Sequence, residues 1–271
     1  MVPLAEVPDH WSAASTYEHF MGRWSRQLAR EFVAWLHAPG GAAWLEIGCG
    51  TGALTAAICD LASPGSVVAC DPSETFIQYA RAHIPDERVS FTVAGADSFP
   101  DRPNGYDSIT SSLALNFFPN PEQAMQRMYA ASSTDGQISA CVWDYAEGMQ
   151  FLRYFWDSAA MISPAAAVQD EGSRFPFCQP DELVELFRGA GLADVRCEPL
   201  EIATPFESFE DYWRPFLGAT GPAPSLVSSL DERTRAQLRH RLEIDLPIQS
   251  DGTIPLTARA WAVRGSRSEP A

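Results

Sequence analysis

The stretch that decides the fold is Leu45–Gly52, which reads LEIGCGTG and closes a short apolar run that starts at residue 43. Residues 43–47 have the pattern of a short buried strand, and a helix is predicted directly after the last glycine. Glycines at alternate positions allow a tight turn with positive φ and let a ligand approach the backbone closely. The spacing is GxGxG rather than the GxGxxG of dinucleotide-binding folds, so the motif alone indicates a nucleotide-like ligand only weakly.

Two acidic residues strengthen that indication, because each follows one of the next two predicted strands. Asp71 ends a strand over residues 66–71, and Asp97 follows a strand over residues 89–93. The first can accept hydrogen bonds from both hydroxyls of a ribose, and the second from an exocyclic amine. Asp97 taken alone fits a solvated helix cap equally well. Together, the glycines and the two acids predict a ligand at the carboxyl edge of a parallel sheet.

The same alternation of strand and helix continues along the chain. Further strands are predicted at 106–111 and 136–142, with a helix beginning at Pro121 between them. Five strands alternating with helices imply parallel pairing through right-handed crossovers. A helix at 181–190 and strands near 194–202 and 254–263 complete the pattern. We therefore predict an α/β fold with a doubly wound, seven-stranded, mostly parallel sheet.

The segments outside this pattern set the predicted domain organisation. We expect a single domain over residues 1–271, built from a helical N-terminal arm, a cofactor-binding core, two cap insertions and the rest of the core sheet. In that order, these parts are 1–38, 39–143, 144–180 with 205–253, and 181–204 with 254–265. The first insertion is expected to be a helix at 149–162 followed by a loop or lid, and the second to hold two or three short helices.

The composition is that of a globular chain, with 46% hydrophobic and 20% charged residues. A formal charge of -16 predicts a surface that repels phosphate backbones, so neither nucleic acid nor an anionic membrane is expected as a partner. No apolar run of about 18 residues and no signal-peptide pattern is evident. The six cysteines form no CxxC pair and no zinc spacing, and three adjoin predicted core strands. These features predict a cytoplasmic protein without a metal site, either a monomer or a homodimer.

Residues 43–142 resemble the class I S-adenosylmethionine-dependent methyltransferases, and are most similar to the small-molecule branch called type 11. The resemblance rests on Leu45–Gly52, on the acids after the second and third strands, and on the fourth-strand stretch YDSITSSLALNF at 106–117. It implies S-adenosylmethionine as cofactor and S-adenosylhomocysteine as product. The cofactor-binding residues implied by the match are Glu46, Gly48, Cys49, Gly50, Gly52, Asp71, Pro72, Ser73, Asp97, Ser98, Ser112 and Leu113. Pro72 departs mildly from the family pattern without removing the acid.

The arm at residues 17–26 resembles the N-terminal segment of one bacterial branch of these enzymes, in which such arms fold over the cofactor. That resemblance implies Arg26 or Arg23 at the methionine carboxylate and Tyr17 beside the sulfonium. The alternative is packing, because Tyr17, Met21, Trp24 and Leu28 form one helical stripe. His19 is the favoured candidate base, with Tyr17, Asp144 and Glu147 as rivals. The histidines at 37, 83 and 240 are expected on the surface.

Aromatic residues crowd the insertions, in the region that lies above the methyl group in this family. A cap of aromatic rings favours an apolar or planar acceptor and suits a sulfonium through cation–π contact. The alternative is that most of these rings simply bury the cap helices. The substrate-binding candidates are Asn116, Trp143, Tyr145, Phe155, Phe175 and Trp213.

These features predict methyl transfer to a small, apolar or aromatic molecule, with O-methylation favoured over C- or N-methylation. In-line displacement at carbon depends on positioning and on exclusion of water. The alternative from another class is a protein of the same fold that binds S-adenosylmethionine without methyl transfer, such as a cyclase-like or scaffold protein. A protein or RNA methyltransferase is disfavoured by the charge.

Overall fold

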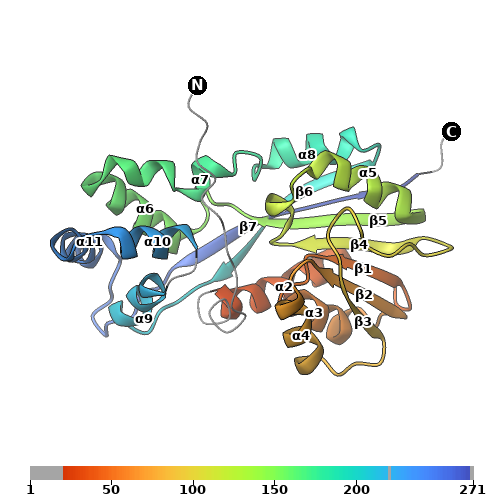
Figure 1. Cartoon of the computed structure of the whole chain (residues 1–271), viewed down its shortest axis with the longest axis horizontal. Helices are drawn as coiled ribbons and strands as arrows, with labels where there is room; N and C mark the ends of the chain where they lie inside the picture. Colours follow the sequence, from red (N-terminus) through yellow and green to blue (C-terminus); the bar gives the residue numbers. More distant parts are fainter. Residues whose placement is uncertain (1–20, 219–220, 269–271) are drawn as a thin grey trace. The chain divides into compact units, whose positions relative to one another are not determined.

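The computed structural model describes residues 21–218 and 221–268, and contains a seven-stranded mixed sheet (Figure 1). The strand order is β3-β2-β1-β4-β5-β7-β6. The pairs β2–β3, β1–β2, β1–β4 and β4–β5 are parallel, whereas β5 and β7 are antiparallel. The strands are β1 Ala43–Ile47, β2 Ser66–Asp71, β3 Val89–Val93, β4 Tyr106–Ser112, β5 Ser132–Trp143, β6 Ala193–Ala203 and β7 Thr257–Ser266. This sheet confirms the predicted doubly wound α/β fold.

The strand order reverses between β1 and β4, because β2 lies on one side of β1 and β4 on the other. Open α/β sheets bind ligands at such a switch point, outside the carboxyl ends of the strands. The register places Glu46 beside Ala69 of β2 and Thr110 of β4. The turns that leave the carboxyl ends of β1, β2 and β4 therefore share one edge of the sheet.

Helices cover both faces of the sheet. Figure 1 shows α2, α3 and α4 grouped on one face, and α5 and α8 on the other. Their bounds are α2 Arg23–Leu36, α3 Ala53–Leu61, α4 Glu74–His83, α5 Pro121–Ala131 and α8 Pro180–Gly189. Polar caps define two of these helices, since Ser73 Oγ accepts from Phe76 N and Asn120 Oδ1 accepts from Gln123 N.

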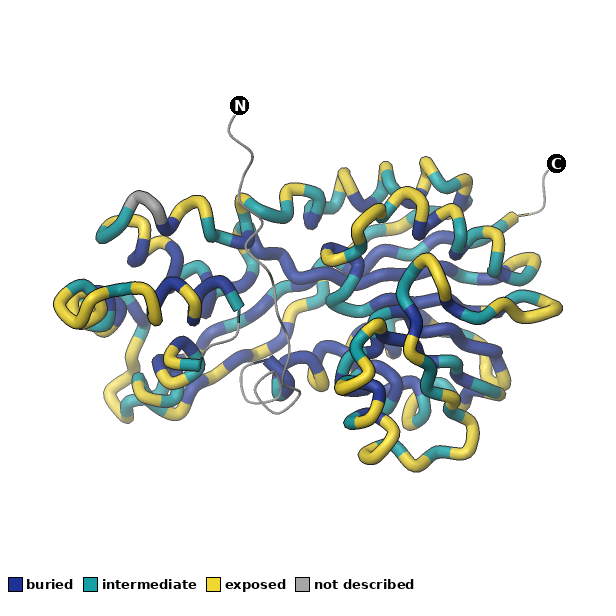
Figure 2. The backbone as a smooth tube through the Cα atoms, viewed as in Figure 1, coloured by how far each residue is buried: buried dark blue, intermediate teal, exposed yellow. Residues whose placement is uncertain are grey.

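The core lies between these layers, and Figure 2 shows the strands as its most buried part. All five residues of β1 are buried. The side chains of Met21, just before α2, and of Trp24 and Leu28, on α2, are at most 6% exposed. The packing interpretation of the N-terminal stripe is thus confirmed for its described members. Tyr17 lies outside the described residues, as does the predicted start of this helix.

The chain divides into two compact units, of which the described parts are 21–143 with 177–201 and 259–268, and 144–176 with 202–218 and 221–258. The first unit contains most of the sheet and its covering helices. The second is mainly helical. Its elements are α6 Gln150–Ile162, η3 Pro164–Val168, α7 Glu171–Arg174, α9 Phe209–Trp213, η4 Arg214–Leu217, α10 Pro222–Ser229 and α11 Glu232–Asp245.

Several predicted bounds differ from the observed ones. The fifth strand begins at Ser132 rather than Gly136, and the last strand runs from Thr257 to Ser266 rather than from 254 to 263. Ile254 instead exchanges two backbone hydrogen bonds with Phe206. The segment predicted as a loop at 164–180 contains the short helices η3 and α7, and α11 is longer than the short helices predicted there. The ends of these strands and helices depend on local packing, which the periodicity of the sequence does not indicate.

An aromatic cluster forms the interior of the helical unit. The rings of Phe155 and Phe216 stack with centroids 4.4 Å apart, and the rings of Phe151 and Tyr212 meet edge to face at 6.3 Å. The Tyr212 hydroxyl donates to the Phe151 carbonyl oxygen at 2.8 Å. Each of these four side chains is at most 2% exposed. Burial of this much aromatic surface gives the unit its own core.

Candidate cofactor and acceptor site

The glycine loop follows β1 and is bound to the end of β2. The amides of Gly48 and Cys49 both donate to the Cys70 carbonyl oxygen, at 2.8 and 2.9 Å. The three glycines Gly48, Gly50 and Gly52 all have left-handed backbones, with φ of 78°, 52° and 91°. Side chains are strained in that region, so the loop geometry requires glycine. Helix α3 begins at the residue after Gly52.

The loop glycines differ in the space around them. A Cβ at Gly48 would lie 2.4 Å from the Ala114 Cβ, and a Cβ at Gly52 would lie 2.4 Å from Cδ1 of Ile84. A Cβ at Gly50 would meet no atom within 4 Å. Close packing therefore requires glycine at Gly48, where the Ala114 Cβ cannot move without its backbone, whereas the Ile84 side chain at Gly52 can shift and the open face at Gly50 lets a ligand approach the backbone.

Asp71 connects the glycine loop to the end of β2. Its carboxylate accepts from the Gly50 amide at 3.0 Å and from the Ser73 amide at 2.8 Å, and the side chain is buried. Burial raises the pKa of Asp71, and the two backbone hydrogen bonds oppose that rise. A carboxylate has about four acceptor positions, so two remain for a pair of ligand hydroxyls. Pro72 is exposed between Asp71 and the helix cap Ser73.

Glu46 lies beneath the loop and is 1% exposed. Its Oε2 accepts from the Thr55 hydroxyl of α3 at 2.5 Å. Burial raises the pKa of Glu46 to about 8, with the nearby Asp71 adding to the rise and Thr55 opposing it. The carboxyl group is therefore mainly protonated at neutral pH. Sequence reasoning missed Thr55, although its place nine residues after Glu46, on the inner face of the next helix, is a usable signal.

Asp97 and Ser98 lie in a turn that follows β3. Both are exposed, and the Ser98 Oγ accepts from the Gly95 amide at 3.0 Å. The turn is also closed by the Ser98 amide, which donates to the Gly95 carbonyl oxygen. The structure thus places Asp97 after the third strand, as the sequence predicted, with its side chain open to solvent. Such a carboxylate can accept a hydrogen bond from an exocyclic amine.

The turn after β4 completes this edge of the sheet. Ser112 is the last residue of the strand, and Leu113 has a left-handed φ of 58°. The Leu113 amide donates to the Cys141 carbonyl oxygen of β5 at 2.7 Å. Non-glycine residues held in this region are strained and cluster at functional sites. Asn116 follows in η2, which spans Leu115–Phe117, and its side chain is buried.

The remaining predicted site residues fall in different places. Arg26 is exposed on α2, whereas the predicted catalytic residues Tyr17 and His19 lie outside the described residues. Trp143, at the end of β5, belongs to the sheet unit and is 2% exposed. In the helical unit, Phe155 and Trp213 lie inside the aromatic cluster. The Tyr145 ring contacts that of Phe175 at 5.4 Å, and Phe175 is partly exposed.

The cysteines are buried or partly buried free thiols. Burial raises the pKa of Cys70 to about 12, and Cys49 shifts in the same direction. Both therefore stay protonated and act as small apolar groups, as predicted. Within the described ranges, no group of three or more His, Cys, Asp or Glu side chains has an arrangement that would hold a metal ion. None of the helices described has the length and apolar composition required to span a bilayer.

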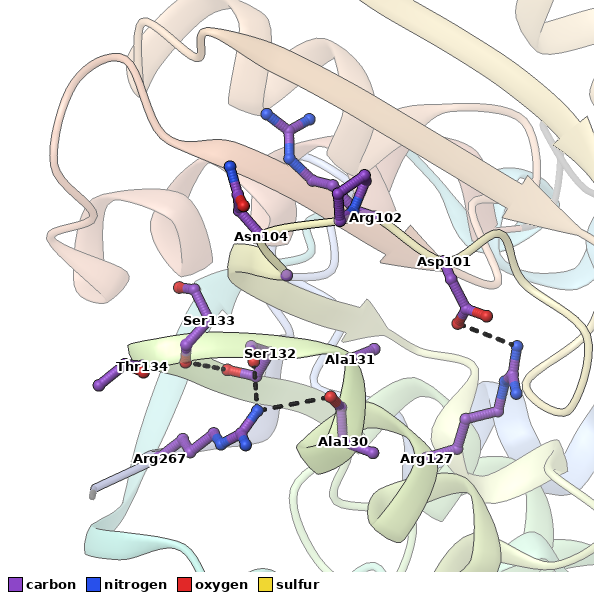
Figure 3. Close-up of a pocket in the computed structure, with 12 residues that line it drawn as sticks. Asp101, Arg102, Asn104, Arg127, Ala130, Ala131, Ser132, Ser133, Thr134 and Arg267 are labelled. Carbon is purple, nitrogen blue, oxygen red and sulfur yellow. Dashed lines mark hydrogen bonds and ion pairs between the residues drawn. The ribbon is translucent and has the colours of Figure 1, made fainter.

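A pocket of about 410 Å³ lies at the opposite edge of the sheet, near the amino ends of β4 and β5 (Figure 3). Its arginines already bind protein groups. Arg267 Nη1 donates to the carbonyl oxygens of Ser132 and Ala130 at 2.5 and 3.4 Å, and Arg127 pairs with Asp101 at 3.6 Å. These contacts hold the end of α5 against β5, so we interpret the pocket as structural and separate from the ligand edge.

The strand order, the glycine loop and the acids at the next two strands define a class I S-adenosylmethionine-dependent methyltransferase. Residues 45–136 match the family model described as "Methyltransferase domain". Residues 45–136 are accordingly a methyltransferase domain, with S-adenosylmethionine as cofactor and S-adenosylhomocysteine as product. The match covers the glycine loop, both acids and the turn after β4.

Curated relatives share modest identity with the chain. A demethylmenaquinone methyltransferase of Symbiobacterium thermophilum is 24% identical over 206 residues, covering 68% of this chain and 80% of that protein. A trans-aconitate 2-methyltransferase of Variovorax paradoxus is 28% identical over 111 residues, covering 41% and 42%. The chain thus spans less than half of the second relative, and the similarity there is restricted to part of each protein.

Solved structures show the same fold. A putative methyltransferase of Bacillus halodurans aligns with a TM-score of 0.57 at 15% identity, covering 89% of this chain and 98% of that one. A phosphoethanolamine N-methyltransferase of Haemonchus contortus, in complex with S-adenosylmethionine, aligns with a TM-score of 0.59 at 13% identity. That alignment covers 94% of this chain and 57% of the other. At these identities the likeness concerns the fold.

Proposed function

We propose that this methyltransferase acts on a small, apolar or aromatic acceptor, and that it methylates oxygen in preference to carbon or nitrogen. The observation that carries the proposal is the cofactor edge, where the open face of Gly50 and the carboxylates of Asp71 and Asp97 follow three adjacent strands. The charge of -16 argues against polyanionic acceptors. Relatives are named as methyltransferases of demethylmenaquinone and trans-aconitate, and both are small molecules.

The relatives leave the methylated atom as a question for experiment. One is named as a ubiquinone/menaquinone biosynthesis C-methyltransferase and another as a malonyl-[acyl-carrier protein] O-methyltransferase. We favour oxygen because a hydroxyl can be aligned by hydrogen bonds, and a buried amide, Asn116, is available at this edge. A neutral acceptor with a ring also fits a chain whose described surface carries excess negative charge.

The residues have distinct proposed roles in holding the cofactor. The glycine loop cradles the methionine part, Asp71 accepts from the ribose hydroxyls, and Asp97 accepts from the adenine amine. When bound, S-adenosylmethionine supplies a methyl group on a positively charged sulfur. The chain's own part would be to align the acceptor oxygen with that methyl carbon and to take up the hydroxyl proton that methyl transfer releases.

The protein contributes mainly by orientation. Alignment of acceptor, methyl carbon and sulfur is worth roughly 7–11 kcal/mol in well-oriented systems. Tyr17 and His19 stay our candidates for a group that takes the acceptor proton. Trp143 and the pair Tyr145 and Phe175 stay candidates for acceptor binding. Phe155 and Trp213 contribute to the aromatic core of the helical unit.

The proposed function is tested by incubating the chain with methyl-labelled S-adenosylmethionine and a panel of phenols, hydroquinones, carboxylates and amines. Label should appear on the oxygen of one acceptor class, identified by mass spectrometry and NMR of the product. Label on carbon or nitrogen would contradict the preference for oxygen. Cofactor binding without transfer to any member of a broad panel would contradict the proposed acceptor class.

Asp71→Ala tests the ribose assignment. Loss of the carboxylate leaves ligand hydroxyls and the Gly50 amide without their acceptor, which should weaken cofactor binding by about 1–3 kcal/mol. Calorimetry with S-adenosylhomocysteine measures the change. Asp60→Ala is the matched control, because Asp60 is an exposed carboxylate paired with Arg30 and should leave affinity unchanged. Equal affinity of the wild type and Asp71→Ala would refute the assignment.

A further inference from the structure

Asn116 is a buried amide whose polar atoms lack partners. Its side chain is 7% exposed, and neither Nδ2 nor Oδ1 has a hydrogen-bond partner among the described residues. Native proteins pair more than about 90% of such groups, because an unpaired buried amide loses its bonds to water and gains none in return. Burial of this amide therefore carries a cost that the described residues do not offset.

The position of Asn116 identifies what can satisfy it. It lies two residues after Ala114, whose Cβ is the atom that a Cβ at Gly48 would meet at 2.4 Å. The residue before Ala114, Leu113, is anchored to the neighbouring strand β5, because its amide donates to the Cys141 carbonyl oxygen. The turn that carries Asn116 is thus packed against the first glycine of the cofactor loop. A ligand bound at the glycine loop would therefore lie near the turn that carries Asn116.

Unpaired polar atoms in the preceding strand provide a contrast. The hydroxyls of Ser108, Thr110 and Ser111 are also buried without partners among the described residues, but all three lie inside β4. Ser108 pairs in register with Trp44 of β1 and Gln137 of β5, toward the amino end of the strand. A buried hydroxyl loses fewer hydrogen bonds to water than an amide, since it has one donor where the amide has two. Asn116 has two donors and an acceptor, and it lies beyond the strand, at the edge where ligands bind.

We propose that Asn116 is a specificity-determining residue that hydrogen-bonds the methyl acceptor, and that the acceptor is uncharged there and has a hydroxyl or carbonyl oxygen beside the methylated atom. The inference rests on the proposed function. Nδ2 donates to that oxygen, and Oδ1 accepts from a hydroxyl. The amide has both N–H donors and an acceptor oxygen, so a neutral hydroxyl can pair with it in either direction, whereas an ionised carboxylate has no donor and would leave Oδ1 unpaired. Such a site rejects analogues that lack the oxygen, because the amide would then stay unpaired.

The test compares Asn116→Leu, Asn116→Gln and the matched control Ser108→Ala, each in the full chain. Leucine has similar volume without polar atoms, and Ser108→Ala removes an unpaired hydroxyl of β4, the strand before Asn116, away from the ligand edge. Three quantities are measured for each: the Tm without ligand, the Kd for S-adenosylhomocysteine, and kcat and KM for the oxygenated acceptors that the wild type methylates.

We expect Asn116→Leu to melt at or above the wild-type Tm and to keep its Kd for S-adenosylhomocysteine within about twofold, while kcat/KM falls about 10- to 100-fold. Asn116→Gln, which keeps the amide, should recover part of the loss, and Ser108→Ala should match the wild type. A parallel fall in affinity for S-adenosylhomocysteine would make Asn116 a cofactor ligand and overturn the inference. Full activity of Asn116→Leu, or a lower Tm with retained activity, would also overturn it.

The two proposals fail in different ways. A wild-type chain that binds cofactor but methylates no panel member contradicts the proposed function, and with it this inference. An active wild type whose Asn116→Leu variant is equally active contradicts the inference alone. An active wild type that accepts deoxygenated analogues as efficiently as their hydroxylated parents contradicts the proposed acceptor chemistry at Asn116.

Discussion

At the scale of single residues, the glycines of the loop have different roles: one packs against a neighbouring turn, and another leaves space for a ligand. Gly48 is confined by Ala114, whereas Gly50 faces open space, although both have positive φ. The sequence motif makes the two positions look equivalent. Their surroundings in the fold predict different consequences for the same substitution.

Gly48→Ala should therefore lower the free energy of unfolding by about 1–3 kcal/mol, because the new methyl group forces the turn after β4 to move. Gly50→Ala should cost only the left-handed strain of about 1 kcal/mol, yet weaken cofactor binding by placing a methyl group where the ligand approaches. Urea denaturation and calorimetry with S-adenosylhomocysteine separate the two effects. Equal losses of stability and of affinity in both variants would contradict this division.

Glu46 makes the stability of the fold depend on pH. Its pKa of about 8 in the fold lies above the unfolded value near 4.5. The folded chain therefore holds a proton that the unfolded chain releases, and the stabilisation is complete below pH 4.5. It is lost as pH rises toward 8, at up to about 1.4 kcal/mol per pH unit.

Glu46→Gln keeps an acceptor for Thr55 but does not titrate, so its free energy of unfolding should fall less than that of the wild type between pH 5 and 8. Urea denaturation at several pH values measures the difference. Glu171, whose pKa burial raises to about 7, should leave some pH dependence of the same sign in both proteins. Parallel curves for the wild type and the variant would show that Glu46 is ionised in the fold.

At the scale of elements, the two edges of the sheet have different tasks. The carboxyl edge carries the glycine loop, the acids and the strained turn at Leu113. The amino edge carries the pocket in Figure 3, where Arg267 binds the last carbonyl groups of α5 and the first of β5. Stability and ligand binding are thus assigned to opposite ends of the same strands.

Arg267→Ala should lower the free energy of unfolding by about 1–3 kcal/mol, because it leaves half-buried carbonyl groups without a charged donor. Cofactor affinity should stay unchanged, since the site lies at the other edge. Arg267→Lys is the matched control and should recover part of the stability. Thermal melting and calorimetry check both statements, and a loss of affinity without loss of stability would contradict the assignment.

At the scale of the whole molecule, the net negative charge predicts that polyanions are not among the partners. The sequence contains 19 basic residues, and all of them are arginine. Several are used inside the fold, as where Arg264 lies over the Trp35 ring at 4.7 Å and donates to the Leu36 carbonyl oxygen at 2.8 Å. The positive groups are thus dispersed among structural contacts, while the excess of 16 negative charges stays.

We predict that the chain binds neither duplex DNA nor RNA, even at about 50 mM salt, where phosphate contacts are strongest. Fluorescence polarisation of labelled oligonucleotides measures this, with an excess of S-adenosylmethionine present in half of the samples. Saturable binding that weakens with added salt would contradict the prediction and reopen the class of nucleic-acid acceptors.

Much of the fold was predictable from the sequence because strand and helix periodicity are local. The strands at 66–71 and 89–93 match their predicted bounds, and the alternation with helices specifies parallel pairing. The segment at 164–180 was predicted less well, because its short helices depend on contacts such as the Trp156 indole donating to Glu171. Those partners are distant from the periodic pattern, so no local signal reports them.

The sequence by itself determined the class of fold, the cofactor and the residues at three strand ends, since each follows from local periodicity and from glycine and carboxylate chemistry. Only the tertiary structure decided the state of those residues. It brought Ala114 against Gly48, placed Thr55 on Glu46, and left Asn116 buried without a hydrogen-bond partner in the described part of the chain. The burial of a side chain and its hydrogen bonds depend on segments that are distant in the sequence. The free-energy cost of a steric contact or of an unpaired buried group therefore arises only when those segments pack together.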